Sequence, residues 1–93
     1  MPADRLHAEA WIGDAVLSLY VRRRILERDG RVDGEKSTRM TSNRFLAAWG
    51  DPTAVEARIG RIYEADGLEA AFAWIEAELA PRFDREERNR HRR

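Results

Sequence analysis

Apolar residues recur at helical spacing in several stretches of the chain, and no segment shows the period-two alternation of a strand. The pattern therefore predicts an all-α protein. The first predicted helix begins at Asp4, a good N-cap, and runs to about Arg28, where Asp29-Gly30 ends it. Residues 10–21 are apolar nearly all round, which is typical of a helix buried on most sides. One small domain would hardly cover such a helix, so the pattern also predicts a dimer.

Three further helices are expected, each bounded by turn residues. They run from the N-cap Asp33 to Trp49, from Asp51-Pro52 to Ala65, and from Leu68 to Pro81. Residues 1–81 are thus predicted to form one compact domain of four to five helices. Residues 82–93 contain six basic and three acidic side chains and are predicted to be a basic, flexible tail, either frayed helix or disordered.

The composition indicates the cellular compartment of the protein more clearly than its function. The 93 residues include no cysteine, which excludes disulfides and thiolate metal sites and fits a reducing compartment. The first residues lack the pattern of a signal peptide, and no apolar run is long enough to span a bilayer, so a cytoplasmic location is expected. Arginine supplies 16 of the 17 basic residues and suits phosphate contacts, but a GC-rich genome would also explain its abundance.

Two acidic residues lie in apolar helix centres. Asp14 is in the first helix, and Glu56 lies beside Val55 and Ile59 in the third. An ionised carboxylate is costly to bury unless it is paired, hydrogen-bonded or bound to a metal. One interpretation is that each acid meets an arginine from a neighbouring helix. The other is that the two carboxylates face each other and hold a hard cation such as Mg²⁺.

Several residues have structural interpretations. Gly13 and Gly60 lie in helix interiors, where glycine usually marks a close approach of two helices. Arg22-Arg23-Arg24 cannot share one helix face, so one or two of them are expected in solvent or on phosphate. The aromatic residues are expected in the core or at a dimer contact rather than as stacking platforms for bases; they are Trp11, Trp49, Phe72 and Trp74.

Four segments, in order, resemble the catalytic domain of the ribonuclease III superfamily, in particular its Mini-ribonuclease III branch. Ala10-Trp11-Ile12-Gly13-Asp14-Ala15-Val16 resembles the signature helix of the family, and residues 36–46 (KSTRMTSNRFL) resemble its next helix. Residues 53–63 (TAVEARIGRIY) resemble the helix with the second acidic pair, and residues 67–71 (GLEAA) resemble the start of the last helix. Together these segments cover most of residues 6–79.

The resemblance implies a Mg²⁺-dependent endoribonuclease, with Mn²⁺ as a substitute, that cleaves structured or double-stranded RNA by metal-activated water. The metal-binding and catalytic acids of the family correspond to Asp14 and Glu56, and Thr53 is a further candidate ligand. Two further acidic positions of the larger bacterial enzymes correspond to Ala10 and Thr53, which have no carboxylate. The Mini-ribonuclease III branch is similar to this chain at both positions. His7 shares a helix face with Asp14 and is expected either to orient water or to be an ordinary surface histidine.

Basic and polar residues of the second helix are candidates for RNA binding: Lys36, Arg39, Asn43 and Arg44. The chain departs from the family after Trp49, where only Gly50 stands in place of one or two helices and a loop that contacts RNA. This shortening and the two missing acids support an alternative, a catalytically silent, ribonuclease III-like dimer that binds RNA or a ribonucleoprotein. A third interpretation is a helical dimerisation module with no role in RNA chemistry.

Overall fold

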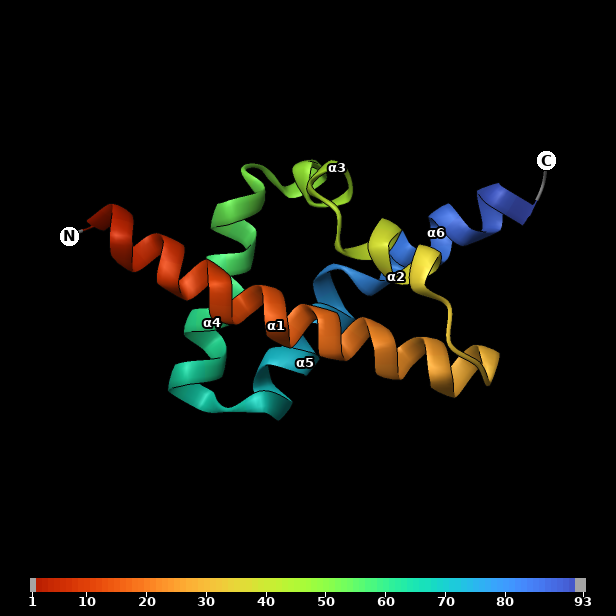
Figure 1. Cartoon of the computed structure of the whole chain (residues 1–93), viewed down its shortest axis with the longest axis horizontal. Coiled ribbons are helices and arrows are strands. Elements are labelled where there is room, and N and C mark those ends of the chain that lie inside the picture. Colours follow the sequence, from red (N-terminus) through yellow and green to blue (C-terminus); the bar gives the residue numbers. More distant parts are fainter. Residues whose placement is uncertain (1, 92–93) are drawn as a thin grey trace.

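The computed structural model describes residues 2–91 and the side chains from Asp4 onward. No strand occurs within this range, so the all-α prediction is confirmed (Figure 1). The helices are α1 (Pro2–Asp29), α2 (Gly34–Thr41), α3 (Asn43–Leu46), the 3-10 helix η1 (Ala47–Trp49), α4 (Pro52–Asp66), α5 (Leu68–Glu78) and α6 (Ala80–His91). They form an elongated molecule of 46 × 23 × 21 Å.

The long helix α1 is the axis of the molecule. Its 28 residues extend along the longest dimension, and α4 crosses it near its N-terminal half (Figure 1). Helix α5 turns back beside α4, while α2 and α6 lie toward the C-terminal end of α1 (Figure 1). No helix within residues 2–91 has the length and apolarity needed to cross a membrane.

The core forms where α1, α4, α5 and α6 meet. Its fully buried side chains come from every major helix and include Leu17, Val21, Ile59, Ile75 and Phe83. Burying a side chain of this size contributes about 1.5–3 kcal/mol to folding. The core therefore holds α4, α5 and α6 against one side of α1.

Most predicted helix ends agree with the structure. The Asp33 carboxylate accepts a hydrogen bond from the Lys36 backbone N–H at 3.0 Å, as expected of an N-cap. Pro52 occupies the first turn of α4, and the positive φ of Gly67, 95°, lets the chain reverse between α4 and α5. The capping and turn residues in the sequence thus predicted these helix ends correctly.

The single helix predicted from Asp33 to Trp49 is interrupted at Ser42. Its side chain donates to the Arg39 carbonyl oxygen at 2.9 Å and accepts from the Phe45 backbone N–H at 3.1 Å. Ser42 therefore ends α2 and caps α3. A short polar side chain that bonds the nearby backbone competes with helix continuation, which explains the break.

The prediction of a separate tail over residues 82–93 differs from the structure as far as residue 91, and residues 92 and 93 lie outside the described part. Residues 80–91 form α6, with Pro81 in its first turn rather than at the end of the domain. Phe83 is fully buried, and Asp84 makes an ion pair with Arg24. The packing of the domain thus continues past Pro81, because one aromatic side chain among charged neighbours anchors the helix.

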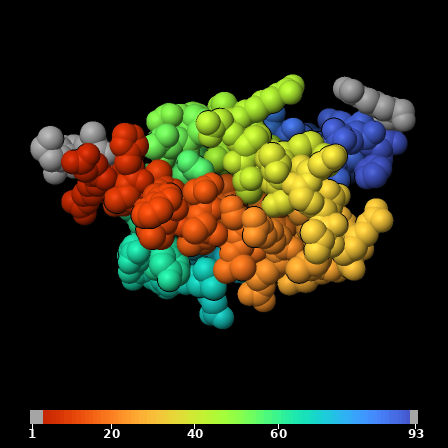
Figure 2. Space-filling model, in the orientation of Figure 1, coloured from red at the N-terminus to blue at the C-terminus, as the bar shows by residue number. Residues whose placement is uncertain are grey.

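One face of α1 remains uncovered. Figure 2 shows this helix, red to orange, lying along the surface of the molecule. Trp11 is 79% exposed, and Leu19 and Leu26 are 42% and 49% exposed. With Ala8 and Ala15, these residues follow helical spacing and form what we call the α1 stripe. Within one subunit the helix is therefore covered on one side and open along this stripe, rather than buried on most sides, and the dimer stays a prediction.

Candidate functional site

Helices α1 and α4 cross with their backbones in direct contact. A Cβ atom built on Gly13 would lie 1.7 Å from the Glu56 carbonyl oxygen, and one built on Gly60 would lie 2.0 Å from the Glu9 carbonyl oxygen. No real Cβ atom tolerates such distances, so only glycine fits at either position. The predicted close approach of Gly13 and Gly60 is confirmed.

This crossing determines which side chains meet beside it. Ala10 of α1 and Ala57 of α4 are both buried, so small residues fill the contact around the two glycines. Asp14 directly follows Gly13, and the Glu56 backbone is the group that Gly13 touches. The Asp14 and Glu56 carboxyl groups are therefore brought together at the edge of the crossing.

The two carboxyl groups interact directly, and we call them the acid pair. Burial, a hydrogen bond with the Asp14 side chain and the negative charge of Asp14 raise the pKa of Glu56 to about 7, with Asp51 adding a smaller repulsion. A carboxyl group with such a pKa keeps its proton at mildly acidic pH. Near neutral pH, Glu56 therefore holds its proton more tightly than an ordinary carboxyl group does.

Within the described part of the chain, no basic side chain neutralises the acid pair. Among residues 4–91, neither Asp14 nor Glu56 takes part in an ion pair. The interpretation in which each acid meets an arginine from a neighbouring helix is therefore not the arrangement found. Glu9 provides the contrast at the same crossing, because its carboxylate meets the Arg61 guanidinium at 3.2 Å.

The sequence predicts that both acids are buried, and the structure shows both to be more exposed. Asp14 is exposed and Glu56 is half-buried. Asp14 lies at the border between the covered side of α1 and its open face, so the apolar neighbours in its sequence do not enclose it. The acid pair is thus open to solvent and to a ligand on one side.

The remaining candidate ligands lie on the same helices. Thr53 is half-buried and one turn before Glu56, while His7 is exposed and two turns before Asp14. The described residues contain no group of three or more acidic, histidine or cysteine side chains placed to hold a metal. The acid pair alone would therefore provide the anionic ligands, which matches the one or two protein carboxylates that Mg²⁺ usually takes.

The structure divides the residues predicted to bind RNA into two groups. The Lys36 ammonium is 2.9 Å from the Asp29 carboxylate and 3.2 Å from that of Glu87, so its charge is used inside the protein. The Arg39 guanidinium lies 3.6 Å from the same Glu87 carboxylate. Asn43 and Arg44 are exposed at the start of α3.

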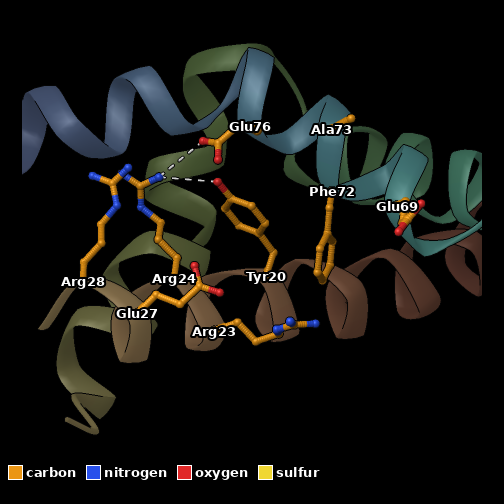
Figure 3. A pocket seen from close by; sticks show the side chains of 9 residues that line it. All are labelled: Tyr20, Arg23, Arg24, Glu27, Arg28, Glu69, Phe72, Ala73 and Glu76. Atoms are coloured by element: carbon orange, nitrogen blue, oxygen red, sulfur yellow. Dashed lines mark hydrogen bonds and ion pairs between the residues drawn. The ribbon is translucent and has the colours of Figure 1, made fainter. Parts of the chain in front are cut away.

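Sequence reasoning missed a buried arginine at the centre of a second cluster. Arg24 is only 7% exposed, and its guanidinium reaches the Tyr20 hydroxyl at 3.4 Å and the Glu76 carboxylate at 3.5 Å (Figure 3). The same guanidinium pairs with Asp84 of α6. This contact ties α1 to both α5 and α6. One indication of this burial was present in the sequence, because three consecutive arginines cannot all lie on the same face of a helix.

The cluster borders a cavity of about 410 Å³. Figure 3 shows Tyr20 and Phe72 side by side in its wall, with Glu69 and Glu76 on α5 facing α1. The Tyr20 and Phe72 rings meet edge to face with their centroids 5.4 Å apart. Positive and negative groups balance here, and the arrangement serves to join helices.

Comparisons with protein-family models, with curated proteins and with solved structures gave no match to this chain. The resemblance to ribonuclease III therefore rests on the sequence motifs alone. Within those motifs, the Gly-Asp element of α1 and the Glu of α4 are the residues that the fold brings together at one site.

Proposed function

We propose that this chain is a ribonuclease III-like, Mg²⁺-dependent endoribonuclease that cleaves structured or double-stranded RNA. The observation that carries the proposal is the acid pair, Asp14 and Glu56, held beside a backbone contact between two helices and without a basic partner among residues 4–91. When both acids are ionised, their repulsion destabilises the fold, and no arginine or lysine among the described residues offsets it. A site that must bind a cation explains this arrangement.

In the proposed reaction, water attacks the phosphorus of a phosphodiester and the bond to the leaving oxygen breaks. Asp14 and Glu56 would hold the divalent ion, which supplies Lewis-acid stabilisation of the phosphoryl oxygens when bound. Thr53, one turn before Glu56, carries a hydroxyl that can orient water at the same edge. The open side of the pair leaves room for the RNA backbone.

Homodimerisation is part of the proposal. The α1 stripe exposes Trp11, Leu19 and Leu26 on one helix face, with Arg22 between the two leucines, and large exposed apolar side chains on one face commonly mark a protein contact. A two-fold dimer buries the same surface of both subunits and places two acid pairs in one assembly. Two sites would allow each subunit to cut one strand of a duplex.

The test is incubation of the purified protein with a long RNA duplex in Mg²⁺ and in EDTA. We expect cleavage in Mg²⁺ or Mn²⁺ only, and a loss of at least about 100-fold in Asp14→Asn and Glu56→Gln, because each removes one of two charged ligands. Glu9→Gln is the matched control, since this carboxylate lies at the same crossing but pairs with Arg61. Its cleavage rate should stay close to that of the wild type.

Two results would contradict the proposal. Cleavage that persists in EDTA or in both acid variants would remove the acid pair from catalysis. Duplex binding without cleavage in either metal would instead favour the silent, RNA-binding dimer, which the missing acids at Ala10 and Thr53 also suggest.

A further inference from the structure

A groove of about 510 Å³ lies between the α2–α3 segment and α6. Its lining includes four arginines, Arg39, Arg44, Arg82 and Arg90, together with the side chains of Glu86, Glu87 and Asn89. Two of the arginines come from α2–α3 and two from α6. We call this feature the arginine groove.

The guanidinium groups of the groove retain unused hydrogen-bond donors. Arg39 meets Glu87 at 3.6 Å and Arg82 meets Glu86 at 3.7 Å, each through one nitrogen. Arg44 and Arg90 make no ion pair with any residue in the described range. Because one guanidinium carries five N–H donors, most donors along the groove remain available to an anion.

The charge balance of the lining is positive. Four arginines against two glutamates leave a net charge of +2, and Glu87 is also neutralised from outside the groove by Lys36 at 3.2 Å. Arginine is the side chain best shaped for bidentate contact with phosphate. The groove is therefore suited to a polyanion.

The floor of the groove offers no apolar anchor point. Met40, Phe45 and Phe83 line it, but they are only 5%, 7% and 0% exposed. Protein partners usually insert an aromatic or aliphatic side chain into an apolar pocket, and these side chains are already covered. The accessible part of the groove is its polar and charged rim, which favours a nucleic-acid backbone over an acidic peptide.

One edge of the groove packs against the segment that precedes α4. The Arg82 guanidinium lies over the Trp49 ring at 6.0 Å from its centroid, and Trp49 is the last residue of η1. Asp51 follows two residues later, at most about 7 Å away along the chain. One edge of the groove thus adjoins the segment that leads into α4, the helix that carries Glu56.

We infer that the arginine groove binds the phosphate backbone of the RNA substrate, an inference that rests on the proposed ribonuclease function. In this arrangement α6 forms one wall of the RNA site. Its position is fixed by the ion pair of Asp84 with the buried Arg24 and by the buried Phe83. Arg44 and Arg90 contribute most, since neither is engaged within the described protein.

Binding is measured apart from cleavage. A fluorescein-labelled RNA duplex is titrated in EDTA at several salt concentrations with the wild type, with Arg44→Gln/Arg90→Gln, and with the control Arg31→Gln/Arg88→Gln. The control removes the same charge from exposed residues, one of them on α6, that do not line the groove. We expect affinity to fall about tenfold or more in the groove variant, with a salt dependence shallower by about two released ions. The control should bind nearly as the wild type does.

A variant with added charge keeps the test independent of any loss of folding. Asn89→Lys places a new cation in the groove and should bind the duplex more tightly than the wild type. Equal affinity in the wild type and both groove variants would overturn the inference while cleavage by the wild type left the proposed function standing. Tight binding of a polyglutamate peptide, with none of the duplex, would also overturn it. Absence of both duplex binding and cleavage in the wild type would remove the proposed function itself.

Discussion

At the scale of single residues, the two glycines of the α1–α4 crossing decide whether the acid pair exists. We expect Gly60→Ala to lower the free energy of unfolding by about 2–3 kcal/mol or more, because its Cβ would lie 2.0 Å from the Glu9 carbonyl oxygen and must push two helices apart. Urea denaturation measures this change.

Gly34→Ala is the matched control for this substitution. Nothing lies within 4 Å of a Cβ atom at Gly34, which is in the first turn of α2. We expect its stability to be unchanged or raised by less than about 1 kcal/mol, because alanine restricts the unfolded chain. If both variants proved equally stable, the backbone contact at the crossing would be disproved.

The raised pKa of Glu56 predicts a pH dependence of stability in EDTA. The folded-state pKa is about 7, above the ordinary value of 4.5, so the folded protein holds this proton more tightly than the unfolded chain. The contribution of Glu56 to stability is therefore complete below about pH 4.5 and is lost as the pH rises through about 7. A shift of this size in a partly solvated group corresponds to about 1–2 kcal/mol after allowance for solvent screening.

Urea denaturation between pH 5 and pH 8 measures this loss, and Glu56→Gln should flatten it because the amide does not titrate. Glu9→Gln should keep the wild-type slope, because Glu9 is paired with Arg61. A wild type whose stability is constant or rises over this range would contradict the assignment.

The contacts of some single residues could be predicted from the sequence, and those of others could not. The close approach of Gly13 and Gly60 followed from their positions in helix interiors. By contrast, the sequence did not predict that Asp14 and Glu56 lack a basic partner among the described residues, because the partner of a side chain depends on which helix faces meet. The burial of Arg24 was also missed, since its three acceptors, Tyr20, Glu76 and Asp84, come from three helices.

At the scale of helices, α6 is the element that the sequence least revealed. Its residues are mostly charged, so its composition resembles a solvated tail, and only Phe83 supplies a large buried apolar side chain. The break at Ser42 was also missed, because a single serine occurs as readily within a helix as at its end. By contrast, the ends of α4 were predicted by proline and glycine, whose effects on the backbone are local.

Phe83→Ala tests whether α6 belongs to the folded domain. The Phe83 ring is fully buried and stacks on Phe45 with the centroids 4.6 Å apart. We expect its removal to cost about 3–5 kcal/mol, measured by urea denaturation. Arg85→Ala, at an exposed position of the same helix, should change stability by less than about 0.5 kcal/mol. A small effect in both variants would mean that residues 82–91 are the tail that their composition suggested.

At the scale of the whole molecule, the open α1 stripe predicts self-association. Sedimentation equilibrium at micromolar concentration should give twice the 10.8 kDa chain mass. Leu19→Arg should shift the protein to monomer, because it places a charge in the middle of the stripe. Tyr63→Arg, at a 38% exposed position on α4, is the control and should remain dimeric. A wild type that stays monomeric and folded would remove the dimer from the account.

The acid pair is also the feature that joins the fold to the proposed function. A long apolar helix, a glycine contact and a second helix place two negative charges together, and the protein provides no cation of its own for them within the described residues. The fold therefore carries an electrostatic cost that a bound divalent ion would offset. This balance between stability and ligand is the central claim, and it can be measured without any RNA.

The most direct test is thermal melting of the wild type and Glu56→Gln at pH 8, at equal protein concentration, in EDTA and in Mg²⁺. In EDTA, Glu56→Gln should melt at or above the wild-type temperature, since it removes the repulsion from Asp14. Mg²⁺ at about ten times its Kd should raise the wild-type melting temperature by about 6–11 °C and leave the variant almost unchanged. A variant that melts far below the wild type, with no effect of Mg²⁺ on either protein, would contradict the account.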